Sequence, residues 1–212
     1  MTLIEDAYSQ LKLQLLSGQW LPGTLLSENE LSEKMRMSRT PIRSAIAQLE
    51  YEGYLQSLKN RGVLVREISY KEIADMLEVL VVIFQLSLRR IEQDHLSIQY
   101  ERLQEELEQA IEAEKNSEYY DYVEHSLNFV ESIIADSRNI ASINMFKQFR
   151  HKLNYFSNIN FLKTRNQPHY SFNQVNQRML AELQEKNYQN CFLAFEKHNQ
   201  QVIYNILRNG TF

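Results

Sequence analysis

The chain has 212 residues, of which 43% are hydrophobic and 24% charged, as expected for a globular protein. Its single cysteine, Cys191, cannot form an internal disulfide, which excludes the disulfide-stapled secreted class. The longest apolar run, 79–84, is far shorter than the ~20 residues that cross a bilayer, and the N-terminus lacks the pattern of a signal peptide. We therefore expect a cytoplasmic protein with no membrane partner. Five glycines and three prolines favour a mainly helical fold.

The charge is unevenly distributed along the chain. The net charge of −4 argues against a nucleic-acid partner, but residues 36–66 carry six Lys/Arg side chains against two Glu side chains. Such a basic segment in an acidic chain is typical of a phosphate-contacting surface. A solvated surface without a partner has the same composition.

The first 35 residues predict two helices. Apolar residues at positions 3, 7, 11 and 15 form one stripe of a helix that ends near Gly18. Ser27 and Glu30 have the spacing of a capping box, which predicts a second, short helix over 28–35.

The next segment predicts a third helix and a β-hairpin. Ser38 or Thr40 can cap this helix, which ends at Gly53, and two short strands follow at 54–58 and 63–66. The buried stripe of the helix consists of Ile42, Ala45, Ile46 and Leu49. This order of elements is that of a winged helix-turn-helix, whose third helix enters the DNA major groove. A three-helix cap that uses arginines for solubility is the alternative.

These residues resemble the GntR family of bacterial transcription regulators. The matching positions are Gly18, Pro22, Gly23, 26–31, 38–43, Ala45, Leu49, Glu50, Glu52, Gly53 and Gly62. The resemblance implies a dimeric repressor that binds a palindromic double-stranded DNA operator. It maps the DNA-contacting positions onto Asn29, Ser38, Arg39, Thr40, Arg43, Arg61 and Gly62. Arginine suits this role because its fork matches the O6 and N7 acceptors of guanine.

Residues 67–212 carry a net charge of −5 and predict an all-helical domain. We place the winged helix-turn-helix domain at 1–68 and the helical domain, for effector binding and dimerisation, at 71–212. The expected helices are 72–94, 100–114, 118–135, 139–157, 172–186 and 188–207. The first of them is apolar on more than one side, which indicates burial in a bundle core or a dimer interface.

One pair of side chains in this domain has the spacing of metal ligands. Asp121 and His125 lie four residues apart and share one helix face, where a metal ion or an ordinary surface pair would both fit. This half of the chain resembles the all-helical ligand-binding (FCD) domain of the FadR-type branch, in its metal-binding subset. The resemblance implies a divalent cofactor, zinc or nickel, held by Asp121, His125 and His198, with Asn176 where the family has histidine. An amide is a weaker ligand than imidazole. Three interpretations therefore stay open: a metal site completed by Asn176 or water, a site that binds an effector without metal, and a remnant of a polar core.

The resemblance also implies a small-molecule effector, such as a metabolite carboxylate. Many relatives carry an arginine after a Glu-Val pair in the first helix of this domain, but here Leu80 follows Glu78 and Val79. Arg150 and Asn176 are the candidate effector-binding residues in its place.

The sequence thus predicts a DNA-binding transcriptional regulator that senses a small ligand and is not an enzyme. A helical metalloenzyme built on Asp121, His125 and His198 would leave the winged-helix pattern without a purpose. A protein-interaction adaptor would use the helical domain as a docking surface.

Overall fold

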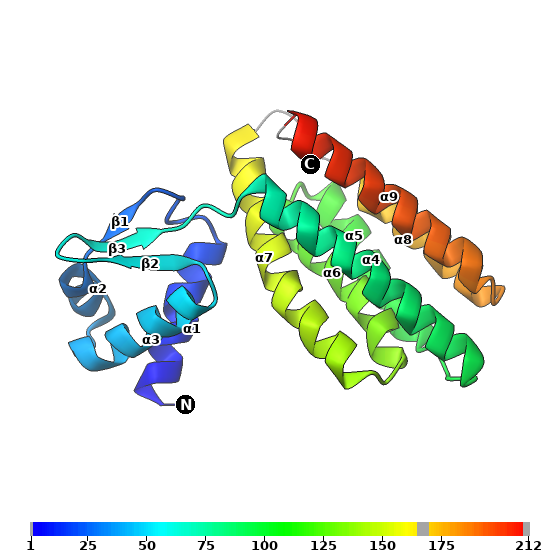
Figure 1. Ribbon diagram of the computed structural model, residues 1–212, viewed down its shortest axis with the longest axis horizontal. Helices are drawn as coiled ribbons and strands as arrows, with labels where there is room; N and C mark the ends of the chain where they lie inside the picture. Colours follow the sequence, from blue (N-terminus) through cyan, green and yellow to red (C-terminus); the bar gives the residue numbers. More distant parts are fainter. Residues whose placement is uncertain (1, 165–169, 210–212) are drawn as a thin grey trace. The chain divides into compact units, whose positions relative to one another are not determined.

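The computed structural model describes residues 2–164 and 170–209 and has a mainly helical fold (Figure 1). The chain divides into two compact units, Met1–Ile68 and Ser69–Phe212. The first contains a winged helix-turn-helix and the second an all-helical bundle, which confirms the predicted fold class. Within the described ranges, no helix combines the length and the hydropathy of a bilayer-spanning segment.

The first unit packs its helices into a small core beside a three-stranded sheet. Its elements are α1 (Leu3–Leu16), β1 (Leu25–Leu26), α2 (Glu28–Met35), α3 (Arg39–Tyr51), β2 (Leu55–Leu58) and β3 (Gly62–Val65). The strands are antiparallel in the order β1-β3-β2. The predicted apolar stripe of α3 is buried, and α1 and α3 contact each other. The predicted stripe of α1 is buried at Ala7, Leu11 and Leu15 but not at Leu3, which is 67% exposed.

Two local details differ from the sequence prediction. Ser27 is the N-cap residue of α2, but its side chain makes no capping hydrogen bond; a complete capping box is found at Thr2 and Glu5, at the start of α1. Strand β1 was not predicted, because two residues are too few to show the alternation of a strand. Leu26 of this strand is buried and pairs with Val63.

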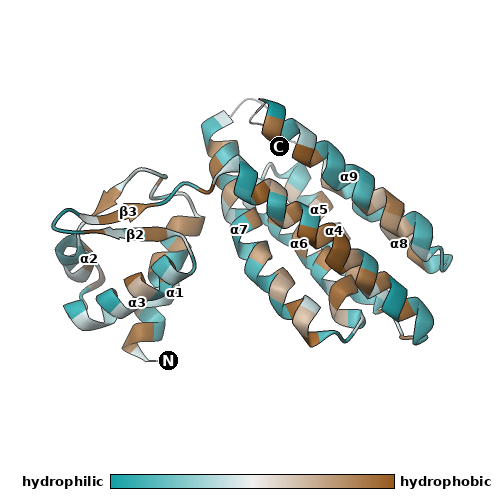
Figure 2. Ribbon diagram, viewed as in Figure 1, coloured by the Kyte–Doolittle hydropathy of each residue, from teal (hydrophilic) through white to brown (hydrophobic). Residues whose placement is uncertain are grey.

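The second unit is a bundle of long helices. They are α4 (Tyr70–Gln93), α5 (Tyr100–Lys115), α6 (Tyr119–Asp136), α7 (Ile140–Thr164), α8 (Ser171–Gln184) and α9 (Tyr188–Asn209). Helix α6 contacts α4, α5, α7 and α8, and α9 packs against α4 and α8. Hydrophobic and hydrophilic residues alternate along the helices (Figure 2), as amphipathic packing requires. The predicted helices agree with these bounds except that α7 continues to Thr164.

Candidate functional site

The exposed end of α3 carries most of the side chains predicted to contact DNA. Ser38 has an extended backbone as N-cap, so that α3 begins at Arg39 with its free N–H groups beside these side chains. The side chains of Ser38, Arg39, Thr40 and Arg43 are exposed, whereas Pro41 and Ile42 are buried. The Ser38 hydroxyl makes no capping hydrogen bond. Hydroxyl, amide and guanidinium donors are thus gathered at one helix end, as contact with phosphates and base edges requires.

Arg43 is held by an ion pair with the preceding helix. Its Nε donates to Glu28 Oε2 at 2.7 Å, while 63% of the Arg43 side chain remains exposed. The contact through Nε fixes the direction of the side chain and links α3 to the first turn of α2.

The turn between β2 and β3 presents Arg61 at its tip. Asn60 and Gly62 both have positive φ angles, 60° and 99°. A Cβ atom at Gly62 would lie 2.5 Å from the backbone oxygen of Leu26, so glycine allows the wing to approach β1. Exposed Arg61 and Asn29 line the same open hollow between the wing and α2. The structure thus places Gly62 in a structural role and Asn29 and Arg61 on one surface.

The helical unit contains a cavity between α4, α6, α7, α9 and the first turn of α8. The space open to the centre of a water molecule is about 60 Å³. Most of the wall is apolar; the apolar lining residues include Leu77, Leu80, Leu127, Val130, Phe195 and Val202. The lining residues that carry polar groups are Tyr119, Tyr122 and Ser126 of α6, Ser157 of α7, Ser171 of α8, and His198 and Asn199 of α9.

The lining residues His198 and Asn199 each carry a buried polar atom without a hydrogen-bond partner among the described residues. The Nε2 atom of His198 and the Oδ1 atom of Asn199 are buried and have no hydrogen-bond partner in the part of the chain that the structure describes. The ring of His198 packs edge-on against Phe172, with 4.4 Å between the ring centroids. Burial lowers the pKa of His198 to about 4, so its imidazole is neutral at pH 7.

Comparison with known proteins identifies the first unit. Residues 3–65 match the family model "Bacterial regulatory proteins, gntR family". The first unit is therefore a DNA-binding unit of the GntR type. The chain is a DNA-binding transcriptional regulator, and the prediction that it is not an enzyme is confirmed by the regulators that it matches.

Similar proteins match different shares of the chain. YdhC of Bacillus subtilis (strain 168), an uncharacterized HTH-type transcriptional regulator, is 23% identical over 96% of this chain and 92% of YdhC. The gluconate operon transcriptional repressor of the same organism is 31% identical over 63% of this chain and 54% of the repressor. A solved GntR regulator from Rhodococcus sp. RHA1 has the same fold, with a TM-score of 0.81, 16% identity and coverage of 97% of this chain and 98% of that one.

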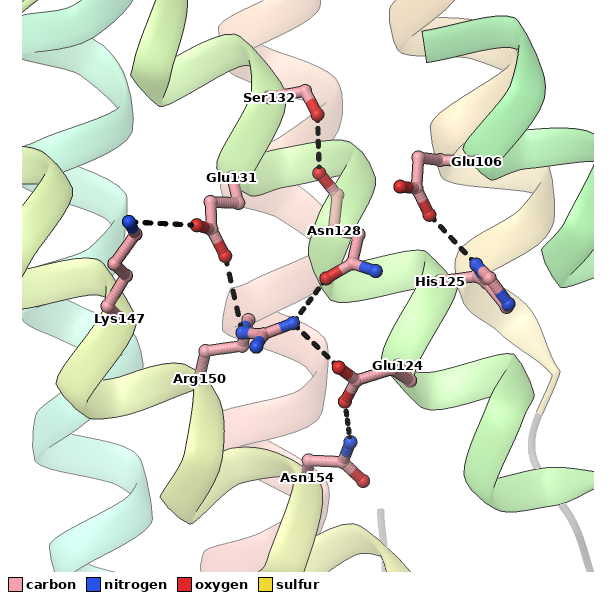
Figure 3. A network of polar contacts seen from close by, with 9 residues as sticks. All are labelled: Glu106, Glu124, His125, Asn128, Glu131, Ser132, Lys147, Arg150 and Asn154. Carbon is pink, nitrogen blue, oxygen red and sulfur yellow. Dashed lines mark hydrogen bonds and ion pairs between the residues drawn. The ribbon is translucent and has the colours of Figure 1, made fainter. Parts of the chain in front are cut away.

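The predicted metal ligands of the helical unit do not come together, which corrects the prediction made from the sequence. Nδ1 of His125 lies 2.8 Å from Oε2 of Glu106 on α5 (Figure 3), and Asp121 is exposed. Neither residue lines the cavity that contains His198. Over residues 2–164 and 170–209, no three His, Cys, Asp or Glu side chains form a group able to hold a metal ion. The residues therefore do not fit the metal that the family resemblance implied.

The physical reason is the rotation of a helix by 100° per residue. Tyr122 and Ser126, each one position after a predicted ligand, face the cavity, and Asp121 and His125 are turned away from it. Val130 continues the cavity face one turn further. Asp121 and His125 lie four residues apart on α6, as predicted, but this spacing does not reveal which face of a helix meets the cavity.

The prediction that Arg150 binds the effector is also wrong, because its guanidinium already forms ion pairs within the protein. Its Nη1 donates to Glu124 Oε1 at 2.7 Å and to Asn128, and its Nε lies 3.2 Å from Glu131 Oε2 (Figure 3). Arg150 does not line the cavity; it joins α7 to α6 through two carboxylates, and Asn154 donates to Glu124 beside it. An effector carboxylate would have to displace two protein carboxylates to reach this guanidinium.

Asn176 lies directly behind the cavity wall. It is completely buried, and its Nδ2 lies 3.5 Å from the backbone oxygen of Ser126, a lining residue, although Asn176 does not line the cavity itself. Ser126 and Asn199 were not among the residues predicted from the sequence. The signal available for them was the i, i+4, i+8 row of Tyr122, Ser126 and Val130, together with the position of Asn199 next to His198.

Proposed function

We propose that this GntR-family regulator binds a palindromic operator as a homodimer, represses transcription in the cytoplasm, and is controlled by a small molecule bound in its helical unit. The observation that carries the DNA part is the exposed group of Ser38, Arg39, Thr40 and Arg43 at the N-terminus of α3. The similarity to a gluconate operon repressor supports the repressor assignment.

Different parts of the DNA surface have different roles in this proposal. The guanidinium groups of Arg39 and Arg43 read base edges in the major groove, because a bidentate fork distinguishes guanine from the other bases. Ser38 and Thr40 contact phosphates, and Arg61 on the wing and Asn29 on α2 contact the flanking duplex. Gly62 acts indirectly by shaping the wing.

The homodimer would use an apolar surface on α4. Val79, Val82 and Leu86 are spaced by three and four residues and are 42%, 63% and 46% exposed. They form a stripe on a helix whose other faces are buried in the bundle, and α9 beside it exposes Tyr204 and Leu207. Exposed apolar stripes of this kind are typical of protein interfaces. A two-fold dimer would match the symmetry of a palindromic operator.

The helical unit is, in this proposal, an FCD-type sensor domain whose ligand occupies the cavity lined by Ser126, His198 and Asn199. A bound effector shifts DNA affinity only by the difference in its own affinity for the DNA-competent and DNA-incompetent arrangements of the dimer. The cavity supports this role because it is formed by several helices at once, so its occupancy affects their packing.

The direct test is selection of duplexes from a random oligonucleotide pool, followed by competition against random DNA. We expect enrichment of a palindrome by the wild-type protein and loss of enrichment by Arg39→Ala. Arg178→Ala, which removes the same charge from the exposed surface of α8, is the matched control and should select the wild-type sequence. Absence of enrichment by the wild-type protein, or equal enrichment by Arg39→Ala, contradicts the proposal.

A further inference from the structure

The lining of the cavity selects one chemical class of ligand. The walls from α4, α6 and α9 are mostly aliphatic or aromatic, and the described lining residues include no carboxylate, lysine or arginine. The space of about 60 Å³ is several times what one water molecule requires. It therefore has room for a compact organic molecule or for a small cluster of waters.

The side chain of Asn199 calls for a hydrogen-bond donor on that molecule. Its Nδ2 donates to the backbone oxygen of Phe195 at 2.8 Å, and this contact fixes the orientation of the amide because a carbonyl oxygen only accepts. The other end of the amide, Oδ1, is a buried acceptor that lacks a donor among the described residues, and Asn199 is 1% exposed. A buried acceptor without a donor costs about 1–3 kcal/mol, so a ligand that donates to it is favoured.

We propose that this cavity binds a small, uncharged, mainly apolar molecule whose hydroxyl or N–H group donates to Asn199 Oδ1, with His198 Nε2 as a second polar contact. This inference rests on the proposed sensor function of the helical unit and names its ligand class. A carboxylate ligand would meet an acceptor at Asn199 and no cation in the described lining, while Arg150 is engaged by Glu124 and Glu131. The ligand class thus differs from the metal-held carboxylate that the family resemblance implied.

The test is calorimetric titration of the full-length protein at pH 7.5 in EDTA with phenol, indole, cyclohexanol and benzoate. We expect saturable binding of one or more of the three neutral probes, one per chain, and binding of benzoate weaker by at least about ten-fold. Ser126→Leu fills the cavity and should abolish this binding. Asn199→Leu removes the acceptor and should weaken it about ten-fold, the equivalent of one lost hydrogen bond.

Two variants serve as controls for these losses. Gln200→Leu changes the exposed neighbour of Asn199, and His125→Ala removes the residue that pairs with Glu106 outside the cavity; both should bind the probe as wild type does. Circular dichroism establishes that each variant is folded. If Asn199→Leu does not fold, Ser126→Leu decides alone.

Three outcomes overturn the inference: no saturable binding of any neutral probe up to millimolar concentration, benzoate binding as tight as that of the neutral probes, or undiminished binding by folded Ser126→Leu. Operator binding by the same preparation separates this failure from failure of the proposed function. If the protein binds the operator but no neutral probe, the proposed ligand class is overturned and the proposed regulator function stands. Release of DNA by benzoate leaves the sensor role intact but also overturns the ligand class.

Discussion

Nε of Arg43 donates to Oε2 of Glu28 at 2.7 Å, so the second helix of the winged domain holds a side chain of the third. The contact uses Nε and leaves the Nη1 and Nη2 groups for a base. Arg43→Ala should weaken operator binding by about 1–3 kcal/mol and relax the preference at one base pair of each half-site. Fluorescence anisotropy with operator variants measures both effects.

Glu28→Gln tests whether the Glu28 carboxylate orients Arg43 for base recognition. Removing the carboxylate lowers the repulsion of phosphates, so we expect tighter binding to random DNA and a smaller ratio of specific to random affinity. A ratio equal to that of wild type would show that the Glu28 contact does not orient Arg43 for base recognition.

Two glycines in the winged domain make a matched pair. Gly23 and Gly62 both have positive φ angles, but a Cβ at Gly23 meets no atom within 4 Å, whereas at Gly62 it would lie 2.5 Å from the Leu26 oxygen. Gly23→Ala should therefore lower the free energy of unfolding by about 1 kcal/mol from backbone strain. Gly62→Ala should lower it by about 2–4 kcal/mol, because the wing must also move away from β1. Urea denaturation compares them, and equal losses would mean that the contact with Leu26 is unimportant.

His198 should make stability depend on pH. Burial lowers its pKa to about 4 in the folded protein from 6.5 in the unfolded chain, so the unfolded state binds more protons between these values. The free energy of unfolding should therefore be at its full value above pH 6.5 and fall by up to roughly 3 kcal/mol as the pH drops to 4. The described lining residues around the ring contribute no other group that titrates in this window.

The matched variants for this prediction are His198→Gln and His95→Gln. His198→Gln should flatten the profile between pH 6.5 and 4, and His95→Gln, a change of an exposed histidine after α4, should keep the wild-type slope. The same slope in His198→Gln and wild type would assign the pH dependence to other groups.

The proposed dimer predicts a different response at two exposed apolar positions. Val82→Glu places a charge in the middle of the α4 stripe and should shift the protein to monomers in sedimentation equilibrium, because burying an unpaired carboxylate is costly. Ile140→Glu, at an equally exposed position at the start of α7, should leave the dimer unchanged. Dimers that persist in Val82→Glu would place the interface elsewhere.

Local patterns in the sequence were sufficient for the helices and the wing but not for the cavity. The stripe from Ile42 to Leu49 predicted α3 because amphipathic spacing reports the buried face of a single helix. Strand β1 was missed because its pairing with β3 depends on contacts distant in sequence. To predict the cavity, one would have to know which face of α6 is turned toward α5 and which is turned away from it. The contact of His125 with Glu106 on α5 shows this, but the contact is visible only in the folded structure.

Arg150 illustrates the same limit for charged side chains. The sequence shows a cation on a central helix, and such a cation suits a ligand carboxylate. The structure shows that Glu124 and Glu131, which lie two turns apart on α6, already pair with it. Composition reveals the charges of a chain, whereas their pairing is decided by the packing of α6 and α7.

Arg39→Lys tests whether an arginine at the start of α3 reads base edges. Lysine keeps the positive charge but lacks the planar fork that matches guanine. The measurement is the ratio of affinities for the selected operator and for random duplex, taken over a series of salt concentrations. We expect Arg39→Lys to keep the wild-type salt dependence on random DNA and to lose about ten-fold or more in affinity for the operator. An unchanged ratio, with or without a uniform loss of affinity, would contradict this expectation.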